Sequence, residues 1–149
     1  MYAYSEAASR IFQIMQDDAK INKKKADFSM VIPYMFLVRH TVELALKVAI
    51  EGFGKKYQMN HKLSANYTKL QNCSTQTLKS VYPAIYNLVN EFDSIDPDGM
   101  YFRYTTDKSG KSILKNTSIQ LSTTQKVLNE FVVQYLKFVK VNLPDLLKQ

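Results

Sequence analysis

Hydrophobic residues recur at three- and four-residue spacing through most of the chain, which is the pattern of amphipathic helices. The first such stretch predicts a helix to about Lys20, with Ser5 as its expected N-cap. A second, longer stretch begins at Asp27 or Ser29 and is ended by two glycines at positions 52 and 54. Apolar residues occupy nearly every face of this second helix, so we expect the core to surround it.

The second half of the chain continues with shorter helical patterns. His61 stands at the entry of a short helix that reaches Leu70. Ser74 or Thr75 is expected to cap the next helix, and Pro83 should kink that helix or delay its start. Turn-forming residues at positions 93–99 then end this helical region.

The helical spacing breaks once, over residues 101–114. Two short β-rich pieces flank a turn that contains Gly110, which predicts a β-hairpin or loop insertion. A last long helix starts near Ser122 or Thr123 and ends before Pro144. The pattern therefore predicts an all-α fold: one domain over residues 1–149, a bundle of four or five helices with two long ones, and a hairpin or loop before the last helix.

Four polar residues form a stripe on the otherwise apolar second helix. Arg39, Glu43 and Lys47 follow one another at four-residue spacing, and His40, Glu43 and Lys47 at spacings of three and four. If the stripe is exposed, the Glu43–Lys47 ion pair would stabilise the helix by only about 0.2–0.5 kcal/mol. Buried, Arg39 and Glu43 would need charged or hydrogen-bonding partners, so the stripe is either a structural lock or the lining of a functional groove.

Partners for a buried stripe could come from the predicted hairpin if it folds over the helix. The partners we consider there are Asp107, Arg103 and the tyrosines at positions 101 and 104. For Arg103 the choice lies between stacking that orders the loop and contact with a phosphate or base. His61 is likewise either a hydrogen-bonded turn residue or a catalytic base.

Composition and charge narrow the classes of function. The chain of 149 residues is 46% hydrophobic and 22% charged, as in one globular domain, and its formal charge of +7 permits attraction to RNA or another polyanion. The single Cys73 excludes an internal disulfide, and the N-terminus lacks the layout of a signal peptide, so a cytoplasmic setting is expected. No membrane span is expected, because charged residues interrupt the longest apolar run.

Several common kinds of site are missing from the sequence. We find no glycine-rich phosphate loop, no close cluster of His and Cys for a metal, and no nucleophile elbow. No metal and no cofactor are therefore predicted. The basic run over residues 22–26 is either a solvated loop or a phosphate-binding patch.

Three segments in order resemble prokaryotic members of the HEPN superfamily (higher eukaryotes and prokaryotes nucleotide-binding domain). They are residues 39–47 of the long helix, residues 61–63 with Leu70 at the next helix, and residues 101–110 before the last helix. The resemblance covers most of the chain, from Met30 onward. It implies an all-α bundle around two long helices, and a homodimer in which the central helices face each other across a groove.

The resemblance also implies a class of function. HEPN proteins of this type act in prokaryotic defence or in toxin–antitoxin systems, and many cleave RNA without a metal. Others bind RNA or nucleotides only, or act as the partner of a nucleotidyltransferase. For this chain the resemblance therefore implies RNA or nucleotide binding, RNA cleavage, and an antitoxin or a nucleotidyltransferase as a protein partner.

Catalytic members carry an arginine, a polar residue and, a few residues later on the same helix, a histidine. Arg39 and His40 match the first half of this motif, but positions 44–46 hold Leu, Ala and Leu, which cannot move a proton. Cleavage without a metal needs a base for the 2′-hydroxyl and a cation for the phosphate. The expected catalytic set is therefore Arg39 on the phosphate, His40 or His61 as the base, and Glu43 as the orienting carboxylate.

RNA contacts are expected from the stripe and from the predicted hairpin, because arginine and aromatic side chains recognise single-stranded RNA. The residues concerned are Lys47, Tyr101, Arg103, Tyr104 and Lys108. The alternative is a non-catalytic helical module for dimerisation or protein binding. In that module the stripe would be buried and fully paired.

Overall fold

The computed structural model describes residues 1–22, 28–103 and 120–148. These residues form six α-helices and one 3₁₀ helix, and contain no strand. The elements are α1 (Tyr2–Asn22), α2 (Phe28–Gly52), α3 (Leu63–Cys73), α4 (Leu78–Val81), α5 (Pro83–Ile95), α6 (Leu121–Asn142) and η1 (Pro144–Leu147). The all-α prediction is confirmed for this part of the chain.

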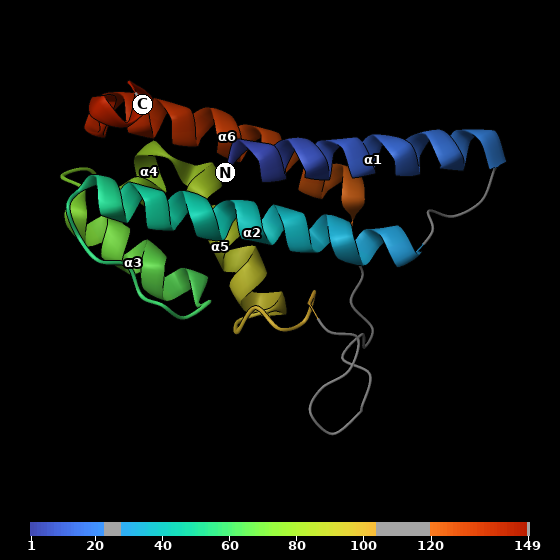
Figure 1. Cartoon of the computed structure of the whole chain (residues 1–149), viewed down its shortest axis with the longest axis horizontal. Coiled ribbons are helices and arrows are strands. Elements are labelled where there is room, and N and C mark those ends of the chain that lie inside the picture. Colours follow the sequence, from blue (N-terminus) through green and yellow to red (C-terminus); the bar gives the residue numbers. More distant parts are fainter. Residues whose placement is uncertain (23–27, 104–119, 149) are drawn as a thin grey trace.

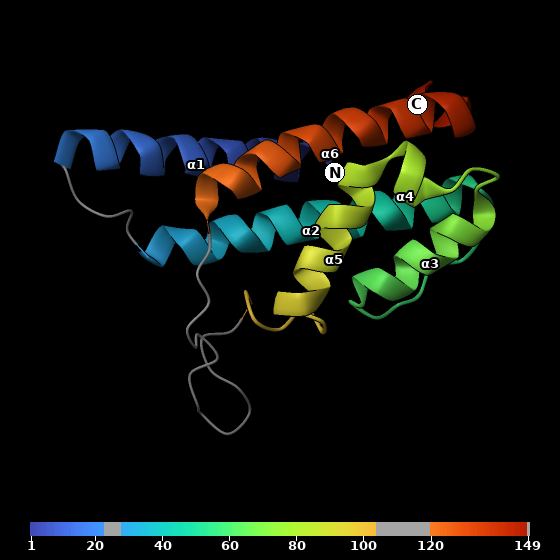
Figure 2. The same ribbon diagram turned by 180° about the vertical axis from the view of Figure 1, so that it is seen from behind.

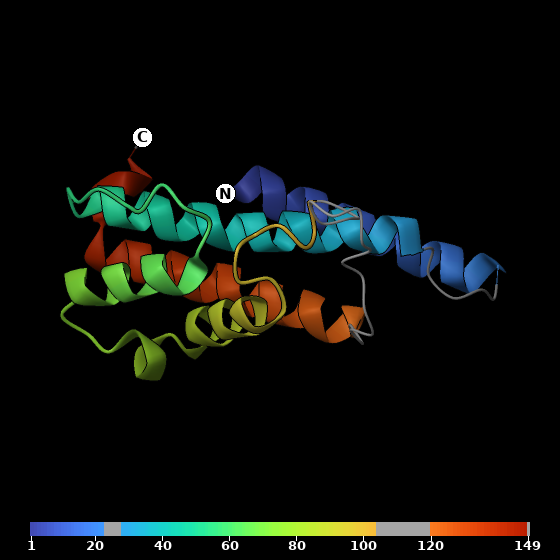
Figure 3. The same cartoon turned by 90° about the horizontal axis from the view of Figure 1, so that it is seen from below.

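Helix α2 is the centre of the fold. It contacts α1, α3, α5 and α6, and α1 lies beside it along much of its length (Figure 1). From behind, α1 and α6 lie above α2 and α3 lies below it, while α5 starts near α6 and crosses α2 (Figure 2). The view from below shows α3 and α5 following one another beside α2 (Figure 3).

The prediction that the core surrounds α2 is largely confirmed. Side chains from several of its faces have no exposed surface, among them Val38, Val42, Leu46 and Ile50. Val48 differs from the prediction, because 41% of its surface is exposed. A helix that buries most of its circumference also buries polar residues on those faces, and this places Arg39 and Glu43 of the stripe inside the protein, with His40 and Lys47 partly buried.

Two predicted N-caps are wrong. Helix α1 begins at Tyr2, so Ser5 lies inside it, where the hydroxyl donates to the carbonyl of Tyr2 at 2.9 Å. Ser74 follows α3 as its C-cap, and the next helix starts only after Thr77. A serine or threonine favours a helix start, but packing decides which one is used.

Pro83 explains why six α-helices are found instead of four or five. It occupies the first position of α5, where its missing N–H group costs no hydrogen bond, and the one-turn α4 precedes it. The next N–H group, that of Ala84, donates to Oε1 of Gln134 on α6 at 2.8 Å. Of the two predicted effects of Pro83, a kink or a delayed start, the structure shows the delayed start.

The predicted hairpin falls mainly on residues 104–119, outside the described residues, as does most of the basic run at 22–26. Residues Tyr101–Arg103 form a turn. In the described part of the chain, no helix is both long enough and apolar enough to cross a membrane.

Candidate functional site

Six charged or titratable side chains meet between α2, the start of α3 and the end of α5. We call them the ion network: Arg39, Glu43, Lys47, His61, Asp96 and Arg103. The first three come from one face of α2, because four residues span about one helical turn. The other three lie just before α3, directly after α5 and in the turn that follows.

Arg39 lies at the closed end of the ion network. Its Nε is 3.1 Å from Oδ2 of Asp96, its Nη1 donates to Oε2 of Glu43 at 3.2 Å, and its Nη2 donates to the His61 carbonyl at 2.7 Å. Burial lowers the pKa of Arg39, while Asp96 and Glu43 act in the opposite direction, and the guanidinium remains charged. Through these contacts Arg39 joins three segments of the protein. Its side chain is only 3% exposed, so it does not face solvent.

Glu43 is the hub of the ion network. One oxygen accepts from Nζ of Lys47 at 2.8 Å and lies 2.9 Å from Nδ1 of His61, while the other accepts from Arg39 and is 3.7 Å from Arg103. Burial alone would raise the pKa of Glu43, but hydrogen bonds and charge from Lys47 and His61 outweigh it and leave the pKa below its ordinary value. Glu43 is therefore an ionised, buried carboxylate.

His61 and Arg103 form the open edge of the ion network, since 40% and 23% of their side chains are exposed. Nη1 of Arg103 lies 3.1 Å from Nε2 of His61. Nη2 of Arg103 also approaches Nδ1 of His61, at 3.3 Å. When Nδ1 donates to Glu43, Nε2 is the ring nitrogen left to accept from Arg103, and the approach of Nη2 to Nδ1 is then a contact between two donors. A carboxylate thus orients the ring, and an arginine covers the nitrogen that could accept a proton.

The ion network carries an excess of positive charge. It contains three permanent cations and two carboxylates, so one positive charge is left over when His61 is neutral. Both carboxylates are buried, Glu43 at 1% and Asp96 at 2% exposure. Among the residues that the structure describes, this excess of positive charge therefore lies toward the open edge, where an anion could bind.

The turn after α5 passes directly over the ion network. Oδ1 of Asp96 accepts from the N–H group of Tyr101 at 2.8 Å and so holds this turn. Gly99 has a φ of 71°, and a Cβ atom there would lie 2.8 Å from Nη1 of Arg39 and 2.9 Å from Cβ of His61. Only a glycine fits this approach without displacing its neighbours.

His40 lies outside the ion network. Its ring stacks on Phe36, with ring centres 5.4 Å apart, and meets Tyr4 edge-to-face at 4.6 Å. Its buried Nδ1 has no hydrogen-bond partner among the described residues. Burial lowers the pKa of His40, so its ring is neutral near pH 7.

The structure brings together five of the residues that the sequence singled out. Arg39, Glu43, Lys47, His61 and Arg103 share the ion network, and Arg103 is a partner of Glu43, as the sequence suggested. Tyr101 lies in the turn above them, with its ring 5.0 Å from that of Phe102. Two further predicted contacts, Tyr104 and Lys108, and the suggested partner Asp107, lie outside the described residues.

Sequence reasoning missed Asp96, Gly99 and Phe36. Asp96 stands among several acidic turn residues, and nothing local distinguishes it from Asp93 or Asp98. Gly99 is recognisable as a turn residue, but not as one that touches Arg39. In the sequence Phe36 looks like an ordinary core residue of α2. In the structure the Arg103 guanidinium carbon lies 5.5 Å from the centre of its ring.

Within the described ranges, no group of three or more His, Cys, Asp or Glu side chains could hold a metal ion. The described side chains of the ion network offer a histidine, its carboxylate and the surrounding cations. No protein-family model, no curated protein and no solved structure matches this chain.

Proposed function

We propose that this chain is a HEPN-like protein that binds single-stranded RNA and cleaves it without a metal at the open edge of the ion network. The observation that carries this proposal is the contact series Glu43–His61–Arg103, at 2.9 Å and 3.1 Å, with His61 and Arg103 partly exposed. It supplies the two groups that such cleavage needs, a base and a cation for the phosphate.

The roles of the predicted residues are divided by burial. His61 is the proposed base and Arg103 the proposed phosphate ligand, because both are accessible at the open edge. Glu43 orients the His61 ring, and Arg39 holds Glu43, Asp96 and the backbone of His61 in place. Arg39 is thus a positioning residue in this proposal and does not touch the phosphate.

Arg103 would change partners when RNA binds. In the free protein its guanidinium donates toward Nε2 of His61. A phosphate is a stronger acceptor for arginine than a neutral imidazole, so it would draw Arg103 away and leave Nε2 free. His61 would then take the proton of the 2′-hydroxyl, the 2′-oxygen would bond to phosphorus, and the bond to the 5′-oxygen would break, with water protonating the leaving oxygen.

The test is to incubate the purified protein with an end-labelled single-stranded RNA in EDTA. We expect fragments that carry a 2′,3′-cyclic phosphate and a 5′-hydroxyl, and no cleavage of DNA of the same sequence, which lacks the 2′-hydroxyl. His61→Gln keeps a hydrogen-bonding side chain but cannot act as a base, and should slow cleavage about 10²–10⁴-fold with RNA affinity changed only a few-fold. Arg103→Gln should weaken RNA binding itself.

Lys79→Gln is the matched control for Arg103→Gln, because Lys79 also lies over an aromatic ring, that of Tyr86, but on α4. It should leave binding and cleavage unchanged. RNA that stays intact both in EDTA and with added Mg²⁺ would rule out cleavage. Binding that is equally weak in the wild type and in Arg103→Gln would rule out the RNA site.

A second candidate function is favoured by the complete pairing of Arg39 and Glu43. Each is buried and contacts at least three partners, which is the arrangement expected of a structural lock in a non-catalytic module. In that case the protein would act by engaging another protein, and neither His61→Gln nor Arg103→Gln would change RNA binding or cleavage. An antitoxin or nucleotidyltransferase partner stays a prediction of the resemblance.

A further inference from the structure

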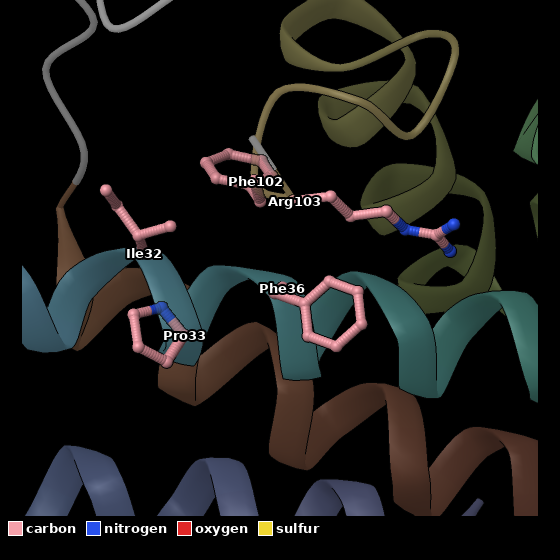
Figure 4. A pocket seen from close by; sticks show the side chains of 5 residues that line it. All are labelled: Ile32, Pro33, Phe36, Phe102 and Arg103. Carbon is pink, nitrogen blue, oxygen red and sulfur yellow. The ribbon is translucent and has the colours of Figure 1, made fainter. Parts of the chain in front are cut away.

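A pocket of about 520 Å³ adjoins the open edge of the ion network. It is lined by Ile32, Pro33 and Phe36 of α2 and by Phe102 and Arg103 of the turn after α5. Figure 4 shows the two groups of side chains facing each other across the opening. The volume lies within the range of small-molecule sites, and of the described residues that line the pocket all but Arg103 are apolar.

Arg103 belongs both to this pocket and to the ion network. In Figure 4 its aliphatic stem starts beside Phe102 and its guanidinium points away from Ile32 and Phe102. That guanidinium reaches His61 at 3.1 Å and lies 5.5 Å from the ring centre of Phe36. An apolar pocket and a positively charged edge are therefore joined by one side chain.

The two aromatic side chains of the pocket are held in place from behind. Phe36 is stacked on His40 at 5.4 Å, with the ring planes only 12° apart. Phe102 is 3% exposed and packs edge-to-face on Phe92 of α5 at 6.1 Å. Phe102 therefore has little free surface, and Phe36 is the ring that a flat ligand would contact. Because Phe36 is already ordered, it loses little entropy when such a ligand binds.

We infer that this pocket is a base-binding slot, which takes the unpaired base of a nucleotide whose phosphate lies at Arg103 and His61. The occupant is chosen by complementarity: a nucleotide joins a flat apolar ring to an anion, and the protein joins an apolar aromatic pocket to an excess of positive charge. This inference rests on the proposed function, because it takes the open edge as the phosphate site. It adds that RNA is recognised through an unpaired base, since a base in a duplex could not enter the slot.

The test compares AMP with ribose 5-phosphate, which has the same phosphate but no base, by NMR titration of the full chain. We expect AMP to bind more tightly than ribose 5-phosphate. Phe36→Leu keeps an apolar side chain but removes the ring, and should weaken AMP binding about 5- to 100-fold. Ribose 5-phosphate has no base to place in the slot, so its binding should weaken much less, and only through the contact of Phe36 with Arg103. Arg103→Gln should weaken both.

Phe53→Leu is the control for loss of a ring. Phe53 comes directly after α2 and packs on Phe138, with ring centres 6.2 Å apart, and it does not line the slot. It should leave AMP binding unchanged, and circular dichroism checks that each variant is folded. Equal affinity for AMP and ribose 5-phosphate would overturn the slot, as would AMP binding that Phe36→Leu and Phe53→Leu weaken alike. Tighter binding of N-acetylphenylalanine amide than of AMP would also overturn it and would point to a protein side chain as the occupant.

The outcomes separate the slot from the proposed function. RNA binding that depends on Arg103, together with equal affinity for AMP and ribose 5-phosphate, would overturn the slot and leave the proposed function standing. AMP binding that depends on Phe36, in a protein that neither binds nor cuts RNA, would support the slot and overturn the proposed function.

Discussion

Arg39 and Arg10 show how burial changes the role of one kind of ion pair, an arginine with a glutamate on the same helix. Each is paired with a glutamate four residues away on its helix, Arg39 with Glu43 and Arg10 with Glu6. The side chain of Arg39 is 3% exposed, whereas that of Arg10 is 76% exposed. Water screens the outer pair, while the inner pair has only protein groups to compensate its charges.

Arg39→Met should therefore be far more destabilising than Arg10→Met. Removing Arg39 leaves Glu43 and Asp96 buried with fewer cations, and the free energy of unfolding should fall by about 3–5 kcal/mol. Arg10→Met should change it by less than about 0.5 kcal/mol. Urea unfolding at pH 7 measures both, and equal losses would show that the buried pair is not what holds the three segments together.

At the scale of elements, the turn between α5 and the open edge sets the geometry of the ion network. Asp96 ends α5, pairs with Arg39 and holds the N–H group of Tyr101, so one side chain links α2 to the turn. The positive φ of Gly99 lets the backbone approach Arg39 and His61 closely. The exposed ends of His61 and Arg103 are positioned by this turn and by the start of α3.

Gly99→Ala and Gly54→Ala form a matched pair that tests the role of this turn. Both glycines have a positive φ, 71° and 68°, but a Cβ atom on Gly54 would meet nothing within 4 Å. Gly54→Ala should cost about 1–2 kcal/mol from backbone strain alone. Gly99→Ala should cost about 1–3 kcal/mol more, because the added methyl group collides with Arg39 and His61.

Thermal or urea unfolding gives the two stability losses, and RNA affinity supplies a second readout. Gly99→Ala should weaken RNA binding because it displaces His61, whereas Gly54→Ala should not. Similar stability losses in the two variants would contradict the close approach seen at Gly99.

At the scale of the whole molecule, α2 is both the central helix and the carrier of the stripe. It contacts four other helices, so the groups on its polar face meet partners from the segment before α3 and from the turn after α5. The chain also carries a formal charge of +7, which favours polyanions and opposes the approach of a second copy.

The homodimer implied by the HEPN resemblance can be tested by light scattering after size exclusion. We expect a mass twice the 17.2 kDa of the chain. Because salt screens the repulsion between two positively charged copies, the dimer fraction should grow between about 0.05 M and 0.5 M NaCl. The mass of a single chain at every salt and protein concentration would contradict the dimer.

Much of the fold was predictable because it depends on local spacing. The three- and four-residue periodicity located α1, α2, α3 and α6 to within a few residues, and it placed α2 at the centre. The caps at Ser5 and Ser74 were wrong because several serines and threonines can start a helix, and packing chooses among them. The stripe itself was visible, since i and i+4 share a face of any helix.

The sequence by itself determined that the chain is helical, that α2 is mostly buried, and that Arg39, Glu43 and Lys47 lie on one face. Only the tertiary structure decided what this face meets. Whether a side chain is buried, paired or accessible depends on residues distant in the chain, such as Asp96 for Arg39 and Arg103 for His61. The sequence predicted Arg39 on the phosphate and His40 or His61 as the base. Packing buries Arg39, stacks His40 on Phe36 and leaves His61 and Arg103 partly exposed.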